Sequence, residues 1–415
     1  MIEPTNALDV AQPAYAELEI LQHKSFSYFL HETNPDNGLV IDKTAADWPA
    51  SIAATGFALA AYPVAVERGF MPRAAAVERT LTTLRFFWNS PQGPEPDATG
   101  YHGFYYHFLD MRTGRRVWQC ELSTIDSAFW LAGALTAGAY FDADTPAEHE
   151  IRNLAETLYC RADWQWAQDG GATVTHGWKP ESGFLKYRWE GYDEAMLLYI
   201  LGLASPTHPL PENSYAAWPS TYRWEHGYGY EYLYAGSLFT YQLSHIWIDF
   251  RGLQDAFMRG NGIDYFEHSR RATYVQQRYA MDNPLKFVGY GRHCRRERRP
   301  QHDQSERDRA PILRLRGTRR AVWARRRHHR AVGCGDIAAV RNGGGPERQE
   351  MERARQLPGG AGGYAYRAPV PAIRPATDYT ARVIPQHTGV CGPAGRRANP
   401  VAAMIRLRME NWYGN

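Results

Sequence analysis

Apolar segments recur along this chain at a nearly constant spacing. Ser51–Ala61 and Ser123–Gly133 align at an offset of 72 residues, and Glu194–Gly202 aligns with the second at an offset of 68. Each is rich in small and apolar residues and too apolar on every side to be a surface helix. Amphipathic, charged segments follow the first two. Because buried and surface helices that alternate at a fixed period build rings of helix pairs, we predict an all-α toroid, an α/α barrel.

The same pattern predicts where the individual helices lie. The predicted inner helices are Ser51–Gly69, Ser123–Tyr140, Asp193–Leu203 and Ala235–Asp249. The predicted outer and flanking helices are Leu18–Glu32, Arg73–Asn89, Pro146–Trp166 and Tyr265–Asp282. Tyr101–Gln119 is expected to form a short strand pair, whereas His208–Ser220 is too rich in proline for a full helix. Four inner helices fit before residue 290, so a closed ring of six would need two more.

The length and the chain's first residues set further expectations. The 415 residues can hold one large domain, which a six-pair barrel would nearly fill. The first 20 residues lack the basic and apolar regions of a signal peptide, and no stretch approaches 18 uninterrupted apolar residues. As written, the chain is expected to be cytoplasmic and to lack a membrane span. Its localisation stays open, because a start codon placed too far downstream would hide a signal peptide. Five cysteines show no metal-ligand spacing.

The composition changes abruptly near residue 290. Residues 1–290 carry a net charge of −13 and all 16 phenylalanines, whereas residues 291–415 carry +16 and contain no lysine. We therefore divide the chain into a flexible leader (1–14), an incomplete helical barrel (15–290) and an arginine-rich region (291–415).

Three interpretations of residues 291–415 are open: a shifted reading frame, a disordered basic extension and a folded domain. A basic tail that binds nucleic acid usually mixes lysine with arginine, so nucleic acid is not an expected partner. Arginine, alanine, glycine and proline are instead what a GC-rich gene yields in the wrong frame. Residues 328–337 can be encoded so that a one-base shift reads Thr-Ile-Ala-Pro-Trp-Ala-Ala-Val-Thr-Ser, an apolar helix start. We favour the shifted frame.

Acidic residues mark the N-terminal ends of two predicted inner helices. Cleavage of a glycosidic bond needs two carboxyl groups that flank it. Glu194 and Asp126 occupy aligned positions in separate inner helices, so both could face one cavity. Glu194 begins a very apolar helix, where burial would raise its pKa and suit a general acid. Asp126 follows Glu121 in a more polar setting that suits a general base, and Glu121 is the third predicted catalytic residue. The alternative is that both acids only stabilise helix N-termini.

Other polar residues are weaker candidates. Asp193 is expected to cap the third inner helix or to support Glu194, and Glu181 lies in a loop. His245 and Asp249 are one helical turn apart, and a hydrogen-bonded core pair is a better interpretation than a pair of ligands. The chain contains no P-loop, dinucleotide fingerprint, GxSxG, HExxH or EF-hand motif, so no metal and no cofactor are expected.

Aromatic residues cluster in the segments between the helices. Aromatic faces stack on the C–H faces of sugar rings, and neighbouring polar side chains can bind hydroxyl groups. The alternative is ordinary packing of large amphipathic residues. The predicted substrate-binding residues are Trp118, Lys186, Trp189, Tyr192, Trp224, His226, Tyr228 and Tyr230.

Three motifs together resemble a known family. They are Glu121-Leu-Ser-Thr-Ile-Asp126, Gly191-Tyr-Asp-Glu-Ala195 and Ala204-Ser-Pro-Thr-His-Pro209, and Arg278–Gly291 continues the likeness. Over roughly residues 20–290 the chain is similar to the glycoamylase-like domain of glycoside hydrolase family 144, bacterial endo-β-1,2-glucanases whose members are often exported. The resemblance implies an (α/α)6 barrel and an endo-acting, inverting hydrolase of β-1,2-linked glucan. By motif match it retains Glu194 and Asp126 as the catalytic pair.

Two other functions stay open at this stage. The chain could be a non-catalytic module that binds or processes glucan, like the related domain inside cyclic β-1,2-glucan synthases. It could also be a helical scaffold with a nucleic-acid-binding tail, which salt-dependent retention of DNA would reveal.

Overall fold

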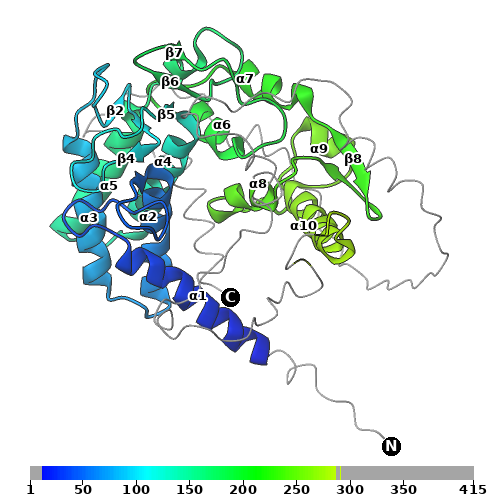
Figure 1. The fold of residues 1–415 in the computed structure, drawn as a ribbon, viewed down its shortest axis with the longest axis horizontal. Helices are drawn as coiled ribbons and strands as arrows, with labels where there is room; N and C mark the ends of the chain where they lie inside the picture. The colour runs from blue at the N-terminus through cyan, green and yellow to red at the C-terminus, as the bar shows by residue number, and fades with distance from the viewer. Residues whose placement is uncertain (1–11, 287–289, 291–415) are drawn as a thin grey trace, which may run out of the picture.

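The computed structural model describes residues 12–286 and Tyr290. These residues are mainly helical and form an open arc, with α2, α4, α6 and α8 on its inner side (Figure 1). The predicted all-α class is confirmed. The arginine-rich region and most of the leader lie outside the described residues.

The inner helices follow the predicted period more regularly than the sequence alignment suggests. They are α2 (Ile52–Glu67), α4 (Thr124–Tyr140) and α6 (Met196–Leu203), which begin 72 residues apart in both steps. The offset of 68 for the third was therefore wrong. Asp126 is the third residue of α4, whereas Glu194 lies in a turn two residues before α6. The turn forms because the Asp193 carboxylate accepts a hydrogen bond from the Ala195 amide at 2.9 Å.

The remaining helices agree with the predictions less evenly. Those on the outer side and at the ends of the arc are α1 (Gln12–His31), α3 (Arg73–Asn89), α5 (Pro146–Arg161), α7 (Glu212–Ala217), α9 (Ala256–Gly260) and α10 (Tyr265–Asp282). Helix α5 ends five residues early, and α9 was not predicted. The predicted fourth inner helix is broken into α8 (Leu238–Gln242) and a 3₁₀ turn, Leu243–Ile246. It begins late because Gly236 has a positive φ of 78°, which a right-handed helix does not allow.

Short strands precede the inner helices. Strands β1 (Ala50–Ser51) and β5 (Leu122–Ser123) run directly into α2 and α4. Antiparallel β1–β4 pairing forms a small two-stranded sheet, and a second sheet has the order β2-β3-β5-β6-β7. The other strands are β2 (Gly100–Tyr101), β3 (Phe104–Tyr106), β4 (Phe108–Leu109), β6 (Gly177–Lys179) and β7 (Gly183–Phe184), and a separate hairpin joins β8 (Trp224–Gly227) to β9 (Tyr230–Leu233). Residues 104–109 therefore tie the starts of two inner helices together.

Helices α2 and α4 cross at two glycines. A Cβ built on Gly133 would lie 2.1 Å from the Gly56 carbonyl oxygen, and one built on Gly56 would lie 2.6 Å from the Phe129 carbonyl oxygen. No side chain fits at such distances, so the small residues of the repeat bring the two backbones into contact. Large side chains fill the space around this crossing, and Trp130 is fully buried on α4.

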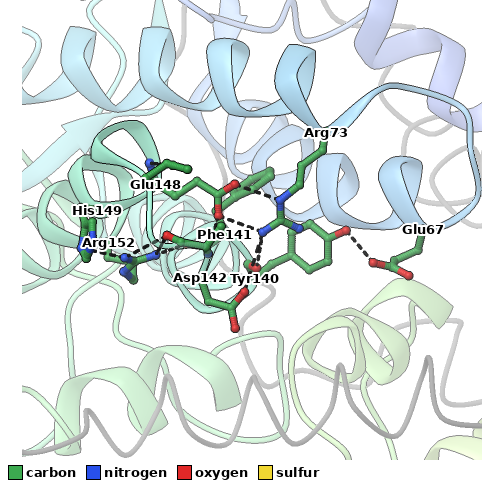
Figure 2. A network of polar contacts seen from close by, with 10 residues as sticks. Glu67, Arg73, Tyr140, Phe141, Asp142, Glu148, His149 and Arg152 are labelled. Atoms are coloured by element: carbon green, nitrogen blue, oxygen red, sulfur yellow. Dashed lines mark hydrogen bonds and ion pairs between the residues drawn. The ribbon is translucent and has the colours of Figure 1, made fainter.

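A polar network joins the outer helices at the other end of α4 (Figure 2). Arg73, the first residue of α3, binds both carboxylate oxygens of Glu148 in α5, at 2.9 and 2.8 Å. Glu148 is 4% exposed and also accepts a hydrogen bond from the Ala143 amide at 2.8 Å. The Arg73 guanidinium also reaches the Tyr140 carbonyl oxygen at 3.3 Å, so one arginine links three helix ends.

Arg73→Met is expected to lower the free energy of unfolding by about 2–3 kcal/mol, because it leaves the buried Glu148 carboxylate without its cation. Arg85→Met is the matched control, since Arg85 makes the same two-pronged contact between α3 and α5 with Glu150 but is solvent-exposed. It should cost less than about 1 kcal/mol. Urea unfolding of the two variants measures the difference, and equal losses would contradict the assignment.

The same contact has a defined pH dependence. The hydrogen bonds from Arg73 hold the pKa of Glu148 below its usual 4.5, against the opposing effect of burial. Its contribution to stability is therefore present above about pH 4.5 and is lost as the pH falls through the lower folded-state pKa. The gap in stability between wild type and Arg73→Met should shrink below pH 4.

Candidate active site

The two inner helices α2 and α4 begin in the same way. Ser51 and Ser123 cap them, accepting hydrogen bonds from the amides of Ala54 and Asp126. In α2 the third position holds alanine, whereas in α4 it holds Asp126. The Ser123 hydroxyl also donates to the Asp126 carboxylate at 2.5 Å. Asp126 therefore has the helix-stabilising role that its sequence position suggested, and its other contacts decide whether it can do more.

A histidine that the sequence did not single out lies between two of the predicted catalytic residues. The β3–β5 register places Tyr106 opposite Leu122, so His107 follows opposite Glu121, and the His107 amide donates to the Glu121 carbonyl oxygen at 3.0 Å. His107 Nδ1 lies 2.9 Å from Glu121 Oε1, and Nε2 lies 3.6 Å from Asp126 Oδ2. We call Glu121, His107 and Asp126 the acid–histidine cluster. Only the strand register could have revealed it.

The cluster places the His107 imidazole between the carboxyl groups of Glu121 and Asp126. Burial alone would lower the pKa of His107, but the charge of Asp126 and the hydrogen bond and charge of Glu121 raise it to about 9. Asp42 adds to this effect from the loop before β1. The pKa of Glu121 is in turn lowered, since the hydrogen bond and charge of His107 outweigh burial. At neutral pH His107 is therefore protonated and Glu121 is ionised.

Glu194 lies at the corresponding end of the next inner helix. Helix α6 packs against α4, and Trp189, in the segment before Glu194, donates its indole N–H to the Thr124 hydroxyl at 3.0 Å. Glu194 is half-buried in the turn that precedes α6. Its neighbour Asp193 accepts hydrogen bonds from the Ala195 amide and from the buried Trp218 indole, and burial raises the pKa of Asp193 to about 7. Asp193 thus shapes the turn that presents Glu194.

The predicted substrate-binding residues divide into exposed and packed groups. Trp118 and Tyr228 are 46% and 41% exposed, and Lys186 and His226 are also exposed. Trp189 is buried, where it stacks on His176 with ring centroids 3.9 Å apart.

Tyr192 and the hairpin aromatics are largely engaged with other rings. Tyr192 packs among Trp218, Tyr222, Tyr241 and Tyr265. In the β8–β9 hairpin, Trp224 contacts Phe257 and Tyr230 stacks on Tyr274 of α10. The hairpin packs on α10, on the opposite side of the arc from α4 (Figure 1).

The weaker polar candidates have structural partners. Glu181 binds Arg116, whose side chain is 1% exposed, at 2.6 Å. Asp249 pairs with Arg251, and His245 packs against Phe250 with ring centroids 4.7 Å apart. Within residues 12–286 no group of three or more histidine, cysteine, aspartate or glutamate side chains is arranged to hold a metal ion. No helix there is long and apolar enough to cross a membrane.

Known proteins share this fold and part of this sequence. The Glycoamylase family model, described as "Putative glucoamylase", matches residues 186–295. An exo β-1,2-glucooligosaccharide sophorohydrolase of Parabacteroides distasonis is 25% identical over 313 residues, which are 67% of this chain. The match covers only 41% of that relative, so this chain spans less than half of its length.

Solved structures agree with the fold. One is the crystal structure of a protein from Bacteroides uniformis that is described as a "putative glucoamylase". It is 29% identical to this chain, with a TM-score of 0.60 over 70% of each chain. An endo-β-1,2-glucanase from Chitinophaga pinensis, solved with sophorotriose and glucose, has a TM-score of 0.60 at 23% identity, over 67% of this chain and 69% of its own. At that identity the second likeness supports the fold alone.

Proposed function

We propose that this chain, in which the predicted resemblance to the glycoamylase-like family is confirmed, is a glycoside hydrolase that cleaves β-1,2-linked glucan. The observation that carries the proposal is the acid–histidine cluster at the start of α4, next to the helix that Glu194 precedes. The name of the Parabacteroides relative supplies the substrate class. The test is release of new reducing ends from β-1,2-glucan.

We propose an inverting mechanism with two carboxyl groups, as the resemblance to family 144 implies. Such a mechanism needs a protonated acid on the leaving-group side and an ionised base that activates water on the other side. We assign Glu194 as the acid, which donates its proton to the glycosidic oxygen. Asp126 is the base, which takes a proton from the water whose oxygen attacks the anomeric carbon. We also propose that the enzyme is endo-acting, which means that it cleaves bonds within the glucan chain.

His107 and Glu121 act as positioning residues for Asp126. A protonated His107 lies against the Asp126 carboxylate and is itself held by Glu121 on its other ring nitrogen. The pair fixes the orientation of the Asp126 carboxylate, as a general base requires.

The account predicts a pH limit that belongs to His107. Since Asp126, Glu121 and Asp42 raise its pKa from 6.5 to about 9, the contribution of the cluster is present below pH 6.5 and is lost as the pH rises through 9. We expect the free energy of unfolding to fall along an alkaline limb near pH 9, and His107→Gln to remove that limb and to lower kcat/KM about 10- to 100-fold. A variant profile that keeps the limb would contradict the role of His107.

A non-catalytic glucan-binding module is the second candidate, because the chain spans only 41% of the curated relative. Binding of β-1,2-glucan without new reducing ends would select it. An assay that measures both glucan binding and the release of reducing ends distinguishes this module from a hydrolase.

We also propose that residues 291–415 are translated in a shifted frame. The loss of lysine and phenylalanine supports this, as does the end of the family match at residue 295. Reading codons 280–345 of the gene in all three frames tests it. An apolar, arginine-poor helical pattern in a neighbouring frame is expected, and its absence from every frame would overturn the proposal.

A further inference from the structure

Trp118 is held in an exposed position by its own backbone. Its side chain is 46% exposed, and both Trp118 and Gln119 lie in the left-handed region, with φ values of 55° and 49°. Two consecutive non-glycine residues in that region cost conformational energy, and such strain concentrates at binding and catalytic sites.

The turn that carries Trp118 is anchored from within. The buried Arg116 side chain donates from Nε to the Cys120 carbonyl oxygen at 2.6 Å, and its guanidinium binds Glu181. The Cys120 amide donates to the Val117 carbonyl oxygen at 3.1 Å. These contacts fix the turn on both sides of Trp118. The ring is therefore preorganised, and little side-chain entropy is lost when a ligand binds to it.

A row of rings connects Trp118 with the acid–histidine cluster. The Trp118 ring meets Phe108 with centroids 5.3 Å apart, and Phe108 stacks on His107 at 4.0 Å. Trp118 also meets Trp48 in an edge-to-face contact, with ring centroids 4.9 Å apart. One oligosaccharide could therefore contact Trp118 while its scissile bond lies at the cluster.

Polar groups border this row at its far end. The Trp48 indole donates to the Asp42 carboxylate at 3.2 Å, and the Lys43 ammonium lies 3.5 Å from the Trp48 ring centroid. Both Asp42 and Lys43 are exposed. An apolar ring face with a charged acceptor and donor at its edge is the combination that binds a sugar ring and its hydroxyl groups.

We propose that Trp118, with Trp48 and Lys43, forms a subsite that stacks a glucosyl ring of the substrate next to the cleaved bond. This subsite rests on the proposed function, because its ligand is the β-1,2-glucan substrate of that activity. Trp118 supplies the stacking face, Trp48 supports it, and Lys43 and Asp42 border it with hydrogen-bonding groups.

The test is binding and cleavage of a β-1,2-linked glucopentaose by the full chain and by Trp118→Ala. We expect Kd and KM to rise about tenfold or more, with kcat changed little, because the ring binds substrate and transition state alike. Trp118→Phe keeps an aromatic face and should fall between the two. Trp88→Ala is the matched control, because Trp88 is 39% exposed on α3 under the Arg161 guanidinium.

The outcomes separate the subsite from the function. If the wild-type chain binds and cleaves the pentasaccharide and Trp118→Ala does so with Kd and KM within twofold, the subsite is wrong and the function stands. If the folded wild type neither binds nor cleaves it, the function is wrong. Folding of each variant is checked by circular dichroism, and Trp118→Phe carries the test if Trp118→Ala fails to fold.

Discussion

Glu194→Gln is expected to lower kcat on β-1,2-glucan by about a thousandfold, within the range that general acid catalysis contributes. The glutamine amide keeps the size and polarity of the side chain but cannot donate the proton that the leaving oxygen needs. The matched control is Glu212→Gln, an exposed acid in the first turn of α7, which should retain full activity. A Glu194→Gln variant that keeps kcat within a few-fold of wild type would remove Glu194 from the mechanism.

A substrate with a better leaving group distinguishes the roles of Glu194 and Asp126. An aryl β-sophoroside with an acidic phenol needs little protonation when its bond breaks, so the Glu194→Gln defect should become much smaller on this substrate. Asp126→Asn should stay equally impaired on both substrates, because water must still be activated. If Asp126→Asn recovers on the aryl substrate and Glu194→Gln does not, the two roles are reversed.

Gly133→Val is expected to lower the free energy of unfolding by about 3 kcal/mol or more. The new Cβ would lie 2.1 Å from the Gly56 carbonyl oxygen, and backbone atoms cannot move aside as a flexible side chain could. Inserting even small groups into a packed core costs about 1–3 kcal/mol, and this site has less room than most. The loss should appear as a lower urea midpoint with an unchanged slope.

Gly138→Ala is the control on the same helix. Its added Cβ would meet the Ala155 Cβ at 3.1 Å and the Arg152 Cα at 3.8 Å, and alanine favours a helix by up to about 1 kcal/mol over glycine. We therefore expect a change within about 1 kcal/mol. If Gly133→Val is as stable as Gly138→Ala, then α2 and α4 do not pack as closely as the structure places them.

The helical period could be read from the sequence because it depends on local composition. Inner helices need small and apolar residues on every side, and this leaves a visible pattern around Gly56 and Gly133. The helix starts that were predicted wrongly depend on single residues. Asp193 binds the Ala195 amide, so α6 begins at Met196 and not at Asp193 as predicted, and Gly236 delays the start of α8.

The candidate site was predictable only in part. Asp126 was found because it is an acid in the first turn of a predicted inner helix, and Glu121 because it precedes that helix. His107 was missed because it joins them through strand register, a contact between residues 14 positions apart along the chain. Trp48 was missed for a similar reason, since it meets Trp118 across 70 residues. Short strands of two or three residues carry too little pattern to reveal such pairings.

The most direct test of the central claim is the release of reducing ends from linear β-1,2-glucan. The assay should use the 415-residue chain beside the protein translated in the restored frame, if the gene contains one, with Glu194→Gln versions of both. We predict β-1,2-linked oligosaccharide products from the unsubstituted protein, with the initial anomeric configuration inverted, and no products from Glu194→Gln. Folded proteins that leave the polymer intact, or cleavage that survives Glu194→Gln unchanged, would contradict the account.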